Sequence, residues 1–420
     1  MDAPNGALQL GVAESKLVEE RLVSKINQLA QQHTFSADCI YYQPTAGRPS
    51  FRQAMAGYIQ DMIQLPAACG SLNTEGLVVG AGCNAVLENL CFALAEPGDS
   101  VLIPTPYYAA FEFDLVARAG LQVQPVNTFE HSGADISTAT VPVEAYYPTA
   151  AALDAAYDQA PAKAKILLLS HPHNPLGIAF PPHVVQECID WCRAKGVHLI
   201  SDEIYAGSVY RPDSANFVSA LELASQPTNK GGLGLGPYVH WVYSLSKDFA
   251  LSGLRVGVAY SENPDIRMPM QKLNDMCQIS SQTQILVEGM MTAKEDDGKQ
   301  WTSAFRAEHQ ARLRARGDRL QSLLHEFDIP HLPATCGLFC WMDLSQFLPL
   351  ADNSNSNANA ERERSLYLSL VNEYGLLFTP GLSMRNERPG FFRCVFSAAH
   401  DDEFDLALMR LRTFLTSQKS

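Results

Sequence analysis

A lysine followed by a short polar segment is the most chemically suggestive feature of the sequence. The apolar run Val239–Tyr243 predicts a strand, and Lys247 follows it after three residues, so the lysine lies at the carboxyl end of that strand. Open α/β sheets bind ligands at this end of their strands. A deprotonated lysine can form an imine with an aldehyde cofactor, and Ser244, Ser246 and Arg255 supply donors for a phosphate. Taken alone, the segment is equally compatible with a surface lysine beside an incidental group of serines.

Two further polar segments follow predicted strands in the same way. Asn174 lies in a turn after the apolar run Ile166–Ser170, and its amide can donate to a phenolate oxygen. Asp202 and Tyr205 follow the next predicted strand. A carboxylate there can keep a pyridine nitrogen protonated, which makes the ring an electron sink, and Tyr205 can bond to the same phenolate. A plain Asn-Pro turn and a helix N-cap at Asp202 are the simpler explanations.

A turn of small residues precedes the predicted helix Asn84–Ala95. The turn contains Gly80 and Gly82 and leads directly into Cys83 and Asn84. Small residues let backbone N–H groups approach a phosphate at the positive end of a helix. The turn matches neither a GxGxxG nor a Walker A loop, so by itself it carries little weight.

Strands alternate with helices over residues 75–270, and these elements must position the polar segments. The apolar runs are short, and helical stretches such as Asn84–Ala95 and Pro182–Lys195 lie between them. The alternation predicts an α/β fold with a mostly parallel central sheet covered by helices on both faces. Residues 262–325 predict long helices, and residues 127–150 predict an irregular stretch.

The chain of 420 residues is too long for one hydrophobic core, because single cores stop growing at about 250–300 residues. We expect an arm and helix at residues 1–38 that belong to the small domain, a large domain over residues 39–290, and a small α+β domain over residues 291–420. The polar segment Asp352–Ala360 predicts a disordered surface loop. The other elements expected in this part are strands at Gly337–Leu344 and Phe391–Phe396 and a closing helix at Glu403–Leu415.

Composition restricts the partners and the location. The net charge is −14 without a basic block, so we expect no nucleic-acid binding and no attraction to an anionic membrane. No apolar run reaches the roughly 18 residues that cross a bilayer, and Met1–Leu10 lacks a secretory signal, so we expect a cytoplasmic protein. The ten cysteines are scattered without a CxxC pair, which predicts buried free thiols and no metal site.

Together these segments resemble the class I/II aminotransferase family of pyridoxal-5′-phosphate (PLP) enzymes, which have fold type I. The resemblance covers nearly the whole chain, and the motifs stand in the family's order. Within the family, the chain is most similar to the 1-aminocyclopropane-1-carboxylate (ACC) synthase-like branch. The segments that carry this closer similarity are Leu10–Leu17, Pro104–Tyr108, Ser201–Ser208, Tyr243–Asp248, Ser280–Gln284 and Gly337–Leu344.

The resemblance implies a role for each polar residue. Lys247 would form the Schiff base with PLP and later move the substrate α-proton. Asp202 would pair with the pyridinium nitrogen, while Asn174 and Tyr205 would bond to the ring hydroxyl. Tyr108 would stack on the ring, with Tyr107 as the second candidate. Arg393 would bind the substrate carboxylate, although a structural salt bridge is the alternative for this arginine. Phosphate binding is implied for Cys83, Asn84, Ser244, Ser246 and Arg255.

Four positions bear on the partner subunit and the substrate. The resemblance implies that Tyr42 reaches the phosphate of a neighbouring subunit, which predicts a homodimer with shared active sites. Glu14 would line the substrate pocket, as in ACC synthases, although an exposed glutamate at a helix start is the alternative. Thr45 stands where ACC synthases have a tyrosine, and His171 stands where the family has the first Asn of its Asn-Pro-x-Asn-Pro segment. These changes leave PLP binding intact and bear on the ACC-forming step.

The resemblance implies a reaction that starts from an amino acid bound to PLP, with removal of its α-proton by Lys247. We expect an ACC-synthase-like elimination or γ-replacement on S-adenosylmethionine that releases methylthioadenosine. The alternative is transamination of a neutral or aromatic amino acid with a 2-oxo acid. We find no second basic residue for a side-chain carboxylate, so we do not expect an aspartate or glutamate specialist. A remote alternative is a non-catalytic regulator with the same fold, but the sequence contains no helix-turn-helix or basic extension.

Overall fold

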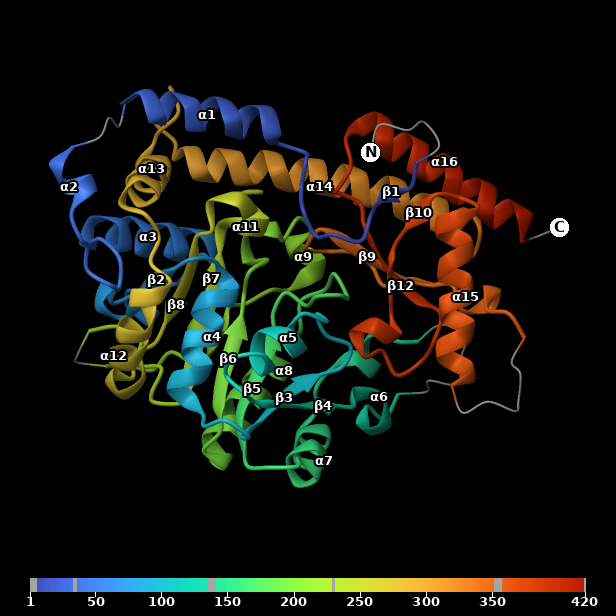
Figure 1. The fold of residues 1–420 in the computed structure, drawn as a ribbon, viewed down its shortest axis with the longest axis horizontal. Helices are drawn as coiled ribbons and strands as arrows, with labels where there is room; N and C mark the ends of the chain where they lie inside the picture. The colour runs from blue at the N-terminus through green and yellow to red at the C-terminus, as the bar shows by residue number, and fades with distance from the viewer. Residues whose placement is uncertain (1–5, 33–35, 135–140, 229–230, 351–356, 419–420) are drawn as a thin grey trace.

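A seven-stranded sheet lies at the centre of the molecule (Figure 1). The computed structural model describes residues 6–32, 36–134, 141–228, 231–350 and 357–418. The strands stand in the order β2-β8-β7-β6-β5-β3-β4, and neighbours are parallel except that β8 is antiparallel to both β2 and β7. Their bounds are β2 Leu77–Gly80, β3 Ser100–Pro104, β4 Gln122–Val126, β5 Ala164–Ser170, β6 His198–Asp202, β7 Val239–Ser244 and β8 Gly257–Tyr260. The predicted α/β fold with a mostly parallel sheet is confirmed.

The central strands are buried on both faces. In β5, Ile166 and Leu168 pack into one apolar cluster with α4 and α5, while Leu167 and Leu169 pack into another cluster with α3 and α8. A strand that is covered on both faces has a continuous hydrophobic sequence. For this reason the apolar runs of the sequence located these strands.

The edge strand β4 was not predicted from the sequence. It contains Gln122, Gln124 and Pro125, and its first four residues keep part of their surface exposed. Proline lacks an N–H group and is accepted in a sheet only at an edge. Since β4 pairs with β3 at the end of the sheet, its sequence satisfies the edge position but does not resemble a buried strand.

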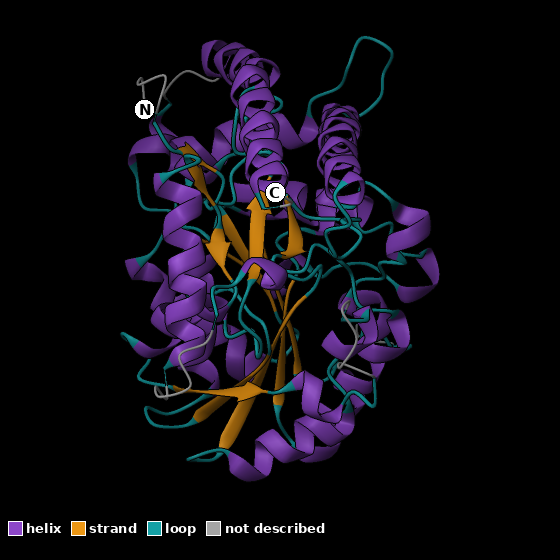
Figure 2. Cartoon of the chain, turned by 90° about the vertical axis from the view of Figure 1, so that its right-hand side faces the viewer, coloured by secondary structure: helices purple, strands orange, loops and turns teal. Residues whose placement is uncertain are grey.

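Helices cover both faces of the central sheet (Figure 2). The α-helices are α1 Glu19–Gln32, α2 Ala37–Ile40, α3 Pro49–Met62, α4 Cys83–Leu94, α5 Phe111–Val116, α6 Thr128–His131, α7 Ala150–Gln159, α8 Pro182–Lys195, α9 Pro212–Ala215, α10 Ala220–Leu223, α11 Leu245–Asp248, α12 Pro264–Leu273, α13 Ser281–Thr292, α14 Trp301–Glu326, α15 Ala358–Asn372 and α16 Asp401–Ser417. Short 3₁₀ turns lie at Ala67–Cys69, Thr74–Gly76, Val143–Tyr146, Ala206–Ser208, Ser252–Leu254, Asn274–Met276, Ser345–Phe347 and Leu382–Met384. Among the described residues, no helix combines the length and the apolar character that a membrane span requires.

A smaller sheet lies in the C-terminal third. It consists of β11 (Thr379–Pro380), β12 (Phe391–Val395) and β9 (Phe339–Asp343), which are antiparallel. The N-terminal arm joins this region, because β1 (Leu8–Gln9) pairs in parallel with β10 (Leu376–Leu377). Leu10, Ala13 and Leu17 of the arm share an apolar cluster with residues of β9, β12, α14 and α16. The first and last parts of the chain therefore lie side by side (Figure 1).

Two predicted irregular segments are partly ordered. The predicted disordered loop is wrong for residues 358–360, because α15 already begins at Ala358 and buries Leu366 and Leu370 further along. Residues 351–356 of that prediction lie outside the described residues. In the segment 127–150, the structure contains α6 and a 3₁₀ turn, and residues 135–140 again lie outside the described residues.

Candidate functional site

A cavity of about 380 Å³ lies at the carboxyl ends of β5, β6 and β7. The start of α4, the segment before α5 and the N-terminal arm complete its wall. It brings together most of the predicted site residues, namely Cys83, Asn84, Tyr108, Asn174, Asp202, Tyr205, Ser246, Lys247, Arg255 and Arg393. Parallel strands end at a common edge of the sheet, which explains why segments far apart in the sequence meet here.

Lys247 occupies the short helix α11 directly after β7. Its Nζ atom donates a hydrogen bond to the carbonyl oxygen of Ala13, at 2.6 Å. Burial lowers the pKa of Lys247 to about 8, the positive charge of Arg393 lowers it as well, and Glu14 acts in the opposite direction. A lysine with this pKa is partly deprotonated near neutral pH, so its amine can act as a nucleophile or a base.

Asp202 is the last residue of β6 and is 5% exposed. Its Oδ1 atom accepts a hydrogen bond from the backbone N–H of Ile204, at 3.2 Å. Burial raises the pKa of Asp202 to about 7; the charge of Asp114 also raises it, while Ile204 N–H and Lys247 lower it. A buried carboxylate of this kind gains a favourable interaction when a cationic group enters the cavity.

Arg393 extends from β12 into the same cavity. It donates to Oδ1 of Asn174 at 2.7 Å and to the carbonyl oxygen of Gly11 at 2.6 Å, and its guanidinium lies over the ring of Phe339. Its Nε is buried and has no hydrogen-bond partner among the described residues. A buried donor without a partner costs free energy, so this guanidinium is positioned to bind an anionic group.

The start of α4 and Arg255 form a region suited to an anion. The first N–H groups of a helix have no partner within the helix and carry a partial positive charge. A Cβ atom on Gly82, the residue before α4, would lie 2.2 Å from a guanidinium nitrogen of Arg255, so only glycine allows Arg255 to lie at this helix end. Ser246 adds a hydroxyl to the same cavity. The donors together match the requirements of a phosphate group.

The structure distinguishes the two adjacent tyrosines. Tyr108 lines the cavity, is 36% exposed and packs edge-on against Phe111. Tyr107 is buried and donates to Glu112 at 2.8 Å, away from the cavity. Of the two candidates for stacking on a ring, Tyr108 is therefore the one with an accessible face. Tyr205 is buried but also reaches the cavity.

Four predicted residues lie outside the cavity wall. Ser244 is buried behind it and donates to the carbonyl oxygen of Val256, at 2.9 Å. Glu14 is exposed and accepts from Ser252 at 2.9 Å. Thr45 uses its carbonyl oxygen to accept from Asn274, and Tyr42 is fully exposed after α2. A single chain does not test the prediction that Tyr42 serves a neighbouring subunit.

Sequence reasoning missed two parts of the cavity wall. The first is the backbone of Gly11 and Ala13, whose carbonyl oxygens accept from Arg393 and Lys247. Any residue has a carbonyl group, so no side-chain type signals this function. The second is Asp114 in α5, whose carboxylate accepts from Asn84 at 2.7 Å. Its position soon after the recognised Pro104–Tyr108 segment was the available signal.

Comparison with known proteins gives a consistent result along the whole chain. The sequence model of the aminotransferase class I and II family matches residues 7–410. ACC synthase 1 of Oryza sativa subsp. indica is 35% identical over 426 residues, which cover 99% of this chain and 82% of that protein. ACC synthase 5 of Arabidopsis thaliana is 34% identical over 424 residues, which cover 99% of this chain and 84% of that protein.

Solved structures share the fold at lower identity. An aspartate aminotransferase double mutant of Thermus thermophilus is 22% identical with a TM-score of 0.75, covering 97% of this chain and 91% of that chain. An aromatic aminotransferase of Pyrococcus horikoshii is 17% identical with a TM-score of 0.76, covering 100% of this chain and 97% of that chain. These structures confirm the predicted fold type.

Proposed function

The chain belongs to the aminotransferase class I and II family of PLP-dependent enzymes, and from this premise we propose that it binds PLP at Lys247 and acts on S-adenosylmethionine with release of methylthioadenosine. The observation that carries the proposal is the position of Lys247 in one cavity with Asp202 and Arg393. The full-length similarity to ACC synthases supports the choice of substrate.

The residues present fit PLP. The start of α4, Ser246 and Arg255 offer donors to its phosphate, and the absence of a side chain at Gly82 makes room for the Arg255 guanidinium at that helix end. Asp202 offers a buried carboxylate to the ring nitrogen, and Tyr205 offers a donor to the ring hydroxyl. When bound, PLP supplies an electron sink for the negative charge that develops at the substrate Cα.

Lys247 and Asp202 have complementary tasks in this proposal. Lys247 would hold PLP covalently, and its amine would be the group in this cavity that accepts the α-proton of the substrate. Its lowered pKa favours both tasks, because the neutral amine is the reactive form. Asp202 keeps the ring nitrogen protonated, and its burial makes the interaction strong because water is excluded.

Arg393 determines how the substrate lies. Its guanidinium is held by Asn174 and by the carbonyl oxygen of Gly11 and lines the cavity, where it can bind a substrate carboxylate. The cavity contains three cationic side chains, Lys247, Arg255 and Arg393, and each has a task in this proposal. No cation of the described wall is left for a second carboxylate, which favours substrates with a neutral or cationic side chain.

Transamination of a neutral or aromatic amino acid is the second candidate, and Glu14 is the observation that favours it. The glutamate that would attract a cationic sulfonium is exposed and does not line the cavity, although it accepts a hydrogen bond from Ser252, which does. Thr45 likewise stands where ACC synthases carry a tyrosine. With its acidic group outside the cavity wall, the arm gives a weaker preference for a sulfonium over an uncharged side chain.

We further propose a homodimer with shared active sites. Ile40 and Tyr41 are more than two-thirds exposed and Tyr42 is fully exposed, on α2 and the loop that follows it, and Met276 is 86% exposed. Exposed apolar side chains in one region indicate a protein contact. Mixing Lys247→Ala protein with Tyr42→Phe protein should restore part of the activity that each parent lacks. A monomer by light scattering at micromolar concentration contradicts the dimer.

Product analysis tests the proposed reaction. The PLP-loaded protein is incubated with S-adenosylmethionine, and separately with a panel of amino acids plus pyruvate or 2-oxoglutarate. Mass spectrometry should detect methylthioadenosine in the first incubation. If no methylthioadenosine forms while phenylalanine or alanine is converted to its 2-oxo acid, transamination replaces the proposed reaction.

A further inference from the structure

The N-terminal arm, residues 11–17, crosses the cavity and offers two backbone acceptors to it. The carbonyl oxygen of Gly11 accepts from Arg393, and the carbonyl oxygen of Ala13 accepts from Lys247. Both cations line the cavity. The exact path of the arm therefore determines where both cations are held, so the contacts that fix the arm bear on the site.

A buried histidine connects the arm to the residue after Lys247. His309 of α14 is 1% exposed, its Nδ1 lies 3.0 Å from the carbonyl oxygen of Asp248, and its Nε2 lies 2.8 Å from Oγ of Ser15. A carbonyl oxygen can only accept, so Nδ1 carries the proton and Nε2 of the neutral ring accepts from the Ser15 hydroxyl. Burial lowers the pKa of His309 to about 4, which agrees with a neutral ring.

Asp248, to which His309 connects the arm, is held by several buried hydrogen bonds. The side chain of Asp248 is 2% exposed and accepts from the backbone N–H of Gly207 at 2.7 Å, from Tyr243 at 3.0 Å and from Ser208. These bonds fix Asp248 and with it the short helix that carries Lys247. His309 therefore connects the arm to a part of the protein that is already held in place.

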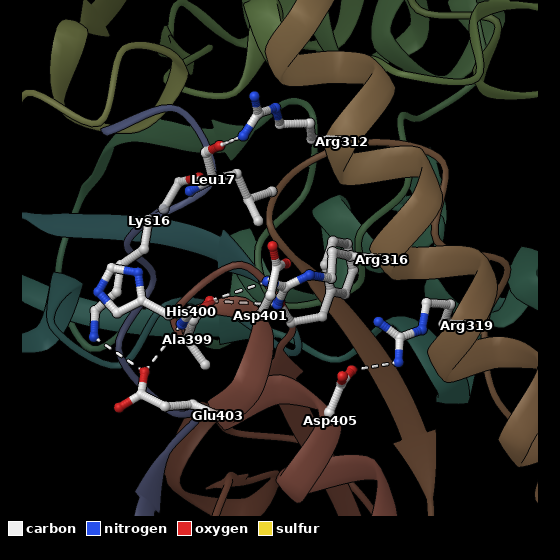
Figure 3. A network of polar contacts seen from close by, with 12 residues as sticks. Lys16, Leu17, Arg312, Arg316, Arg319, Ala399, His400, Asp401, Glu403 and Asp405 are labelled. Carbon is white, nitrogen blue, oxygen red and sulfur yellow. Dashed lines mark hydrogen bonds and ion pairs between the residues drawn. The ribbon is translucent and has the colours of Figure 1, made fainter. Parts of the chain in front are cut away.

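The end of the arm has further polar contacts. The buried Ser397 hydroxyl donates to the carbonyl oxygen of Glu14, at 2.6 Å, and the ion pairs around Lys16 are shown in Figure 3. Lys16 pairs with Glu403 at 3.4 Å, and both side chains are about one-third exposed. The figure also shows Arg312 donating to the carbonyl oxygen of Leu17. Exposed ion pairs contribute roughly 0–1 kcal/mol, and a buried hydrogen bond leaves an unsatisfied group when it is broken. Ser397 ties the arm to the segment after β12, whereas the Ser15–His309 bond ties it to Asp248, next to Lys247. Loss of the Ser15–His309 bond should therefore loosen the arm where it lies against Lys247.

We propose that His309 is a positioning residue that locks the arm through Ser15, so that the carbonyl oxygens of Ala13 and Gly11 hold Lys247 and Arg393 in place. The inference deepens the proposed function and rests on the roles assigned there to these two cations. The connection itself consists only of contacts within the chain. It can therefore be tested in the protein without PLP and without any turnover.

Hydrogen exchange of the PLP-free protein is the primary test. The backbone N–H of Lys16 donates to the carbonyl oxygen of Ser397, at 2.9 Å, so its exchange reports whether the arm is docked. Ser15→Ala should speed exchange of the peptide over residues 8–17 by about fivefold to tenfold, the range expected for one buried hydrogen bond. The matched control is Ser261→Ala, since Ser261 is also buried and bonds to a buried histidine, His240, at 2.9 Å. That variant should leave the arm peptide unchanged.

A second variant tests whether the two residues act together. His309→Phe keeps an aromatic ring in the core and removes both hydrogen bonds. If Ser15 and His309 form one connection, the double variant should exchange no faster at the arm than the His309→Phe variant. Equal exchange of the arm in Ser15→Ala and Ser261→Ala, or additive effects in the double variant, overturns the proposal.

Kinetics then separates positioning from a general loss of stability. In the PLP-loaded protein, Ser15→Ala should raise KM and lower kcat by several-fold each, because both Arg393 and Lys247 lose a backbone acceptor. Ser261→Ala should lower the melting temperature by a similar amount without this kinetic change. Equal kinetics of the two variants contradicts the role of His309. If the wild-type protein shows no turnover, the proposed function fails, while the exchange data still decide whether the connection exists.

Discussion

The floor and the cover of the cavity are built in different ways. The floor consists of Asn174, Asp202 and Lys247, and each lies on or just after one of three adjacent strands. The cover is the backbone of Gly11 and Ala13, held by bonds to residues more than 200 positions away in the sequence. Reactive groups are thus encoded locally in the sequence, while the groups that orient them depend on long-range packing. Changes to the floor should abolish chemistry, and changes to the cover should only weaken it.

Loss of the lysine amine should have the largest effect. Lys247→Ala removes both the covalent anchor of PLP and the base, and general-base catalysis alone contributes 10²–10⁴-fold, so turnover should fall by about 10⁴-fold or more. PLP should still bind weakly through the phosphate donors. Lys299→Ala, at an exposed ion pair with Asp297, is the control and should behave as wild type. Residual turnover near the wild-type rate would place the chemistry elsewhere.

Asp202→Asn should be the next most damaging change in the floor. A neutral ring nitrogen is a poor electron sink, so exchange of the substrate Cα proton with deuterated solvent should slow by about 10²–10⁴-fold. Nuclear magnetic resonance of the recovered amino acid measures this exchange. A rate like that of the wild type would remove Asp202 from its role.

The Asp202→Asn variant should lose activity but gain stability when PLP is absent. Burial raises the pKa of Asp202 to about 7 in the protein without PLP, so the folded state is penalised for holding the charged form. This free-energy cost is absent at pH values below the pKa of the unfolded state, which is near 4. It grows as the pH rises towards 7 and reaches its full value above pH 7. Asp202→Asn should therefore stabilise the PLP-free protein at pH 8 by up to ~4 kcal/mol, and not at pH 3.5. Denaturant titration at both pH values measures the difference.

Arg393 links the floor to the cover, and its replacement should have an intermediate effect. Lysine cannot form the forked pair of hydrogen bonds that arginine makes with a carboxylate, so Arg393→Lys should raise KM on the order of 10–100-fold. Arg412→Lys, at an exposed pair with Glu326, is the matched control in steady-state kinetics. An unchanged KM in Arg393→Lys would show that the carboxylate binds elsewhere.

The pH dependence of cofactor binding should reveal the environment of the lysine. Burial and the charge of Arg393 lower the pKa of Lys247 to about 8, and only the neutral amine attacks an aldehyde. The rate at which the PLP-free protein develops visible absorbance with PLP should therefore rise with pH through a midpoint of about 8. A midpoint near 10, the usual value of lysine, would mean that the amine is not buried.

The smallest effect is expected for Glu14, an exposed residue of the N-terminal arm. Glu14 is exposed and bonds to Ser252, so Glu14→Gln should raise the KM for S-adenosylmethionine by at most about fivefold, as for an exposed ion pair. The KM for a neutral amino acid should not change. An equal effect on both substrates would indicate that Glu14 only stabilises the arm.

The same contrast explains how much the sequence could predict. Buried strands and the side chains after them were found because a strand such as β5 is continuously apolar and is followed by the distinctive Asn174. The edge strand β4 and the arm pairing of β1 with β10 were not found, because they are short or polar and depend on distant partners. Ser244 lies beside Ser246 as the sequence suggested, with the two hydroxyls 2.8 Å apart, but Ser244 also donates to the carbonyl oxygen of Val256 and does not line the cavity. The direction of a side chain is set by the fold, which the motif does not contain.

Borohydride reduction of the PLP-loaded protein tests whether Lys247 is the lysine that binds the cofactor. Reduction converts the Schiff base to a stable secondary amine, so the visible absorbance should disappear and a pyridoxyl mass should remain on one peptide. We expect fragmentation of this peptide to place the mass on Lys247, with no labelled lysine in the Lys247→Ala variant. A mass on another lysine, or on none, would contradict the assignment of this cavity as the PLP site.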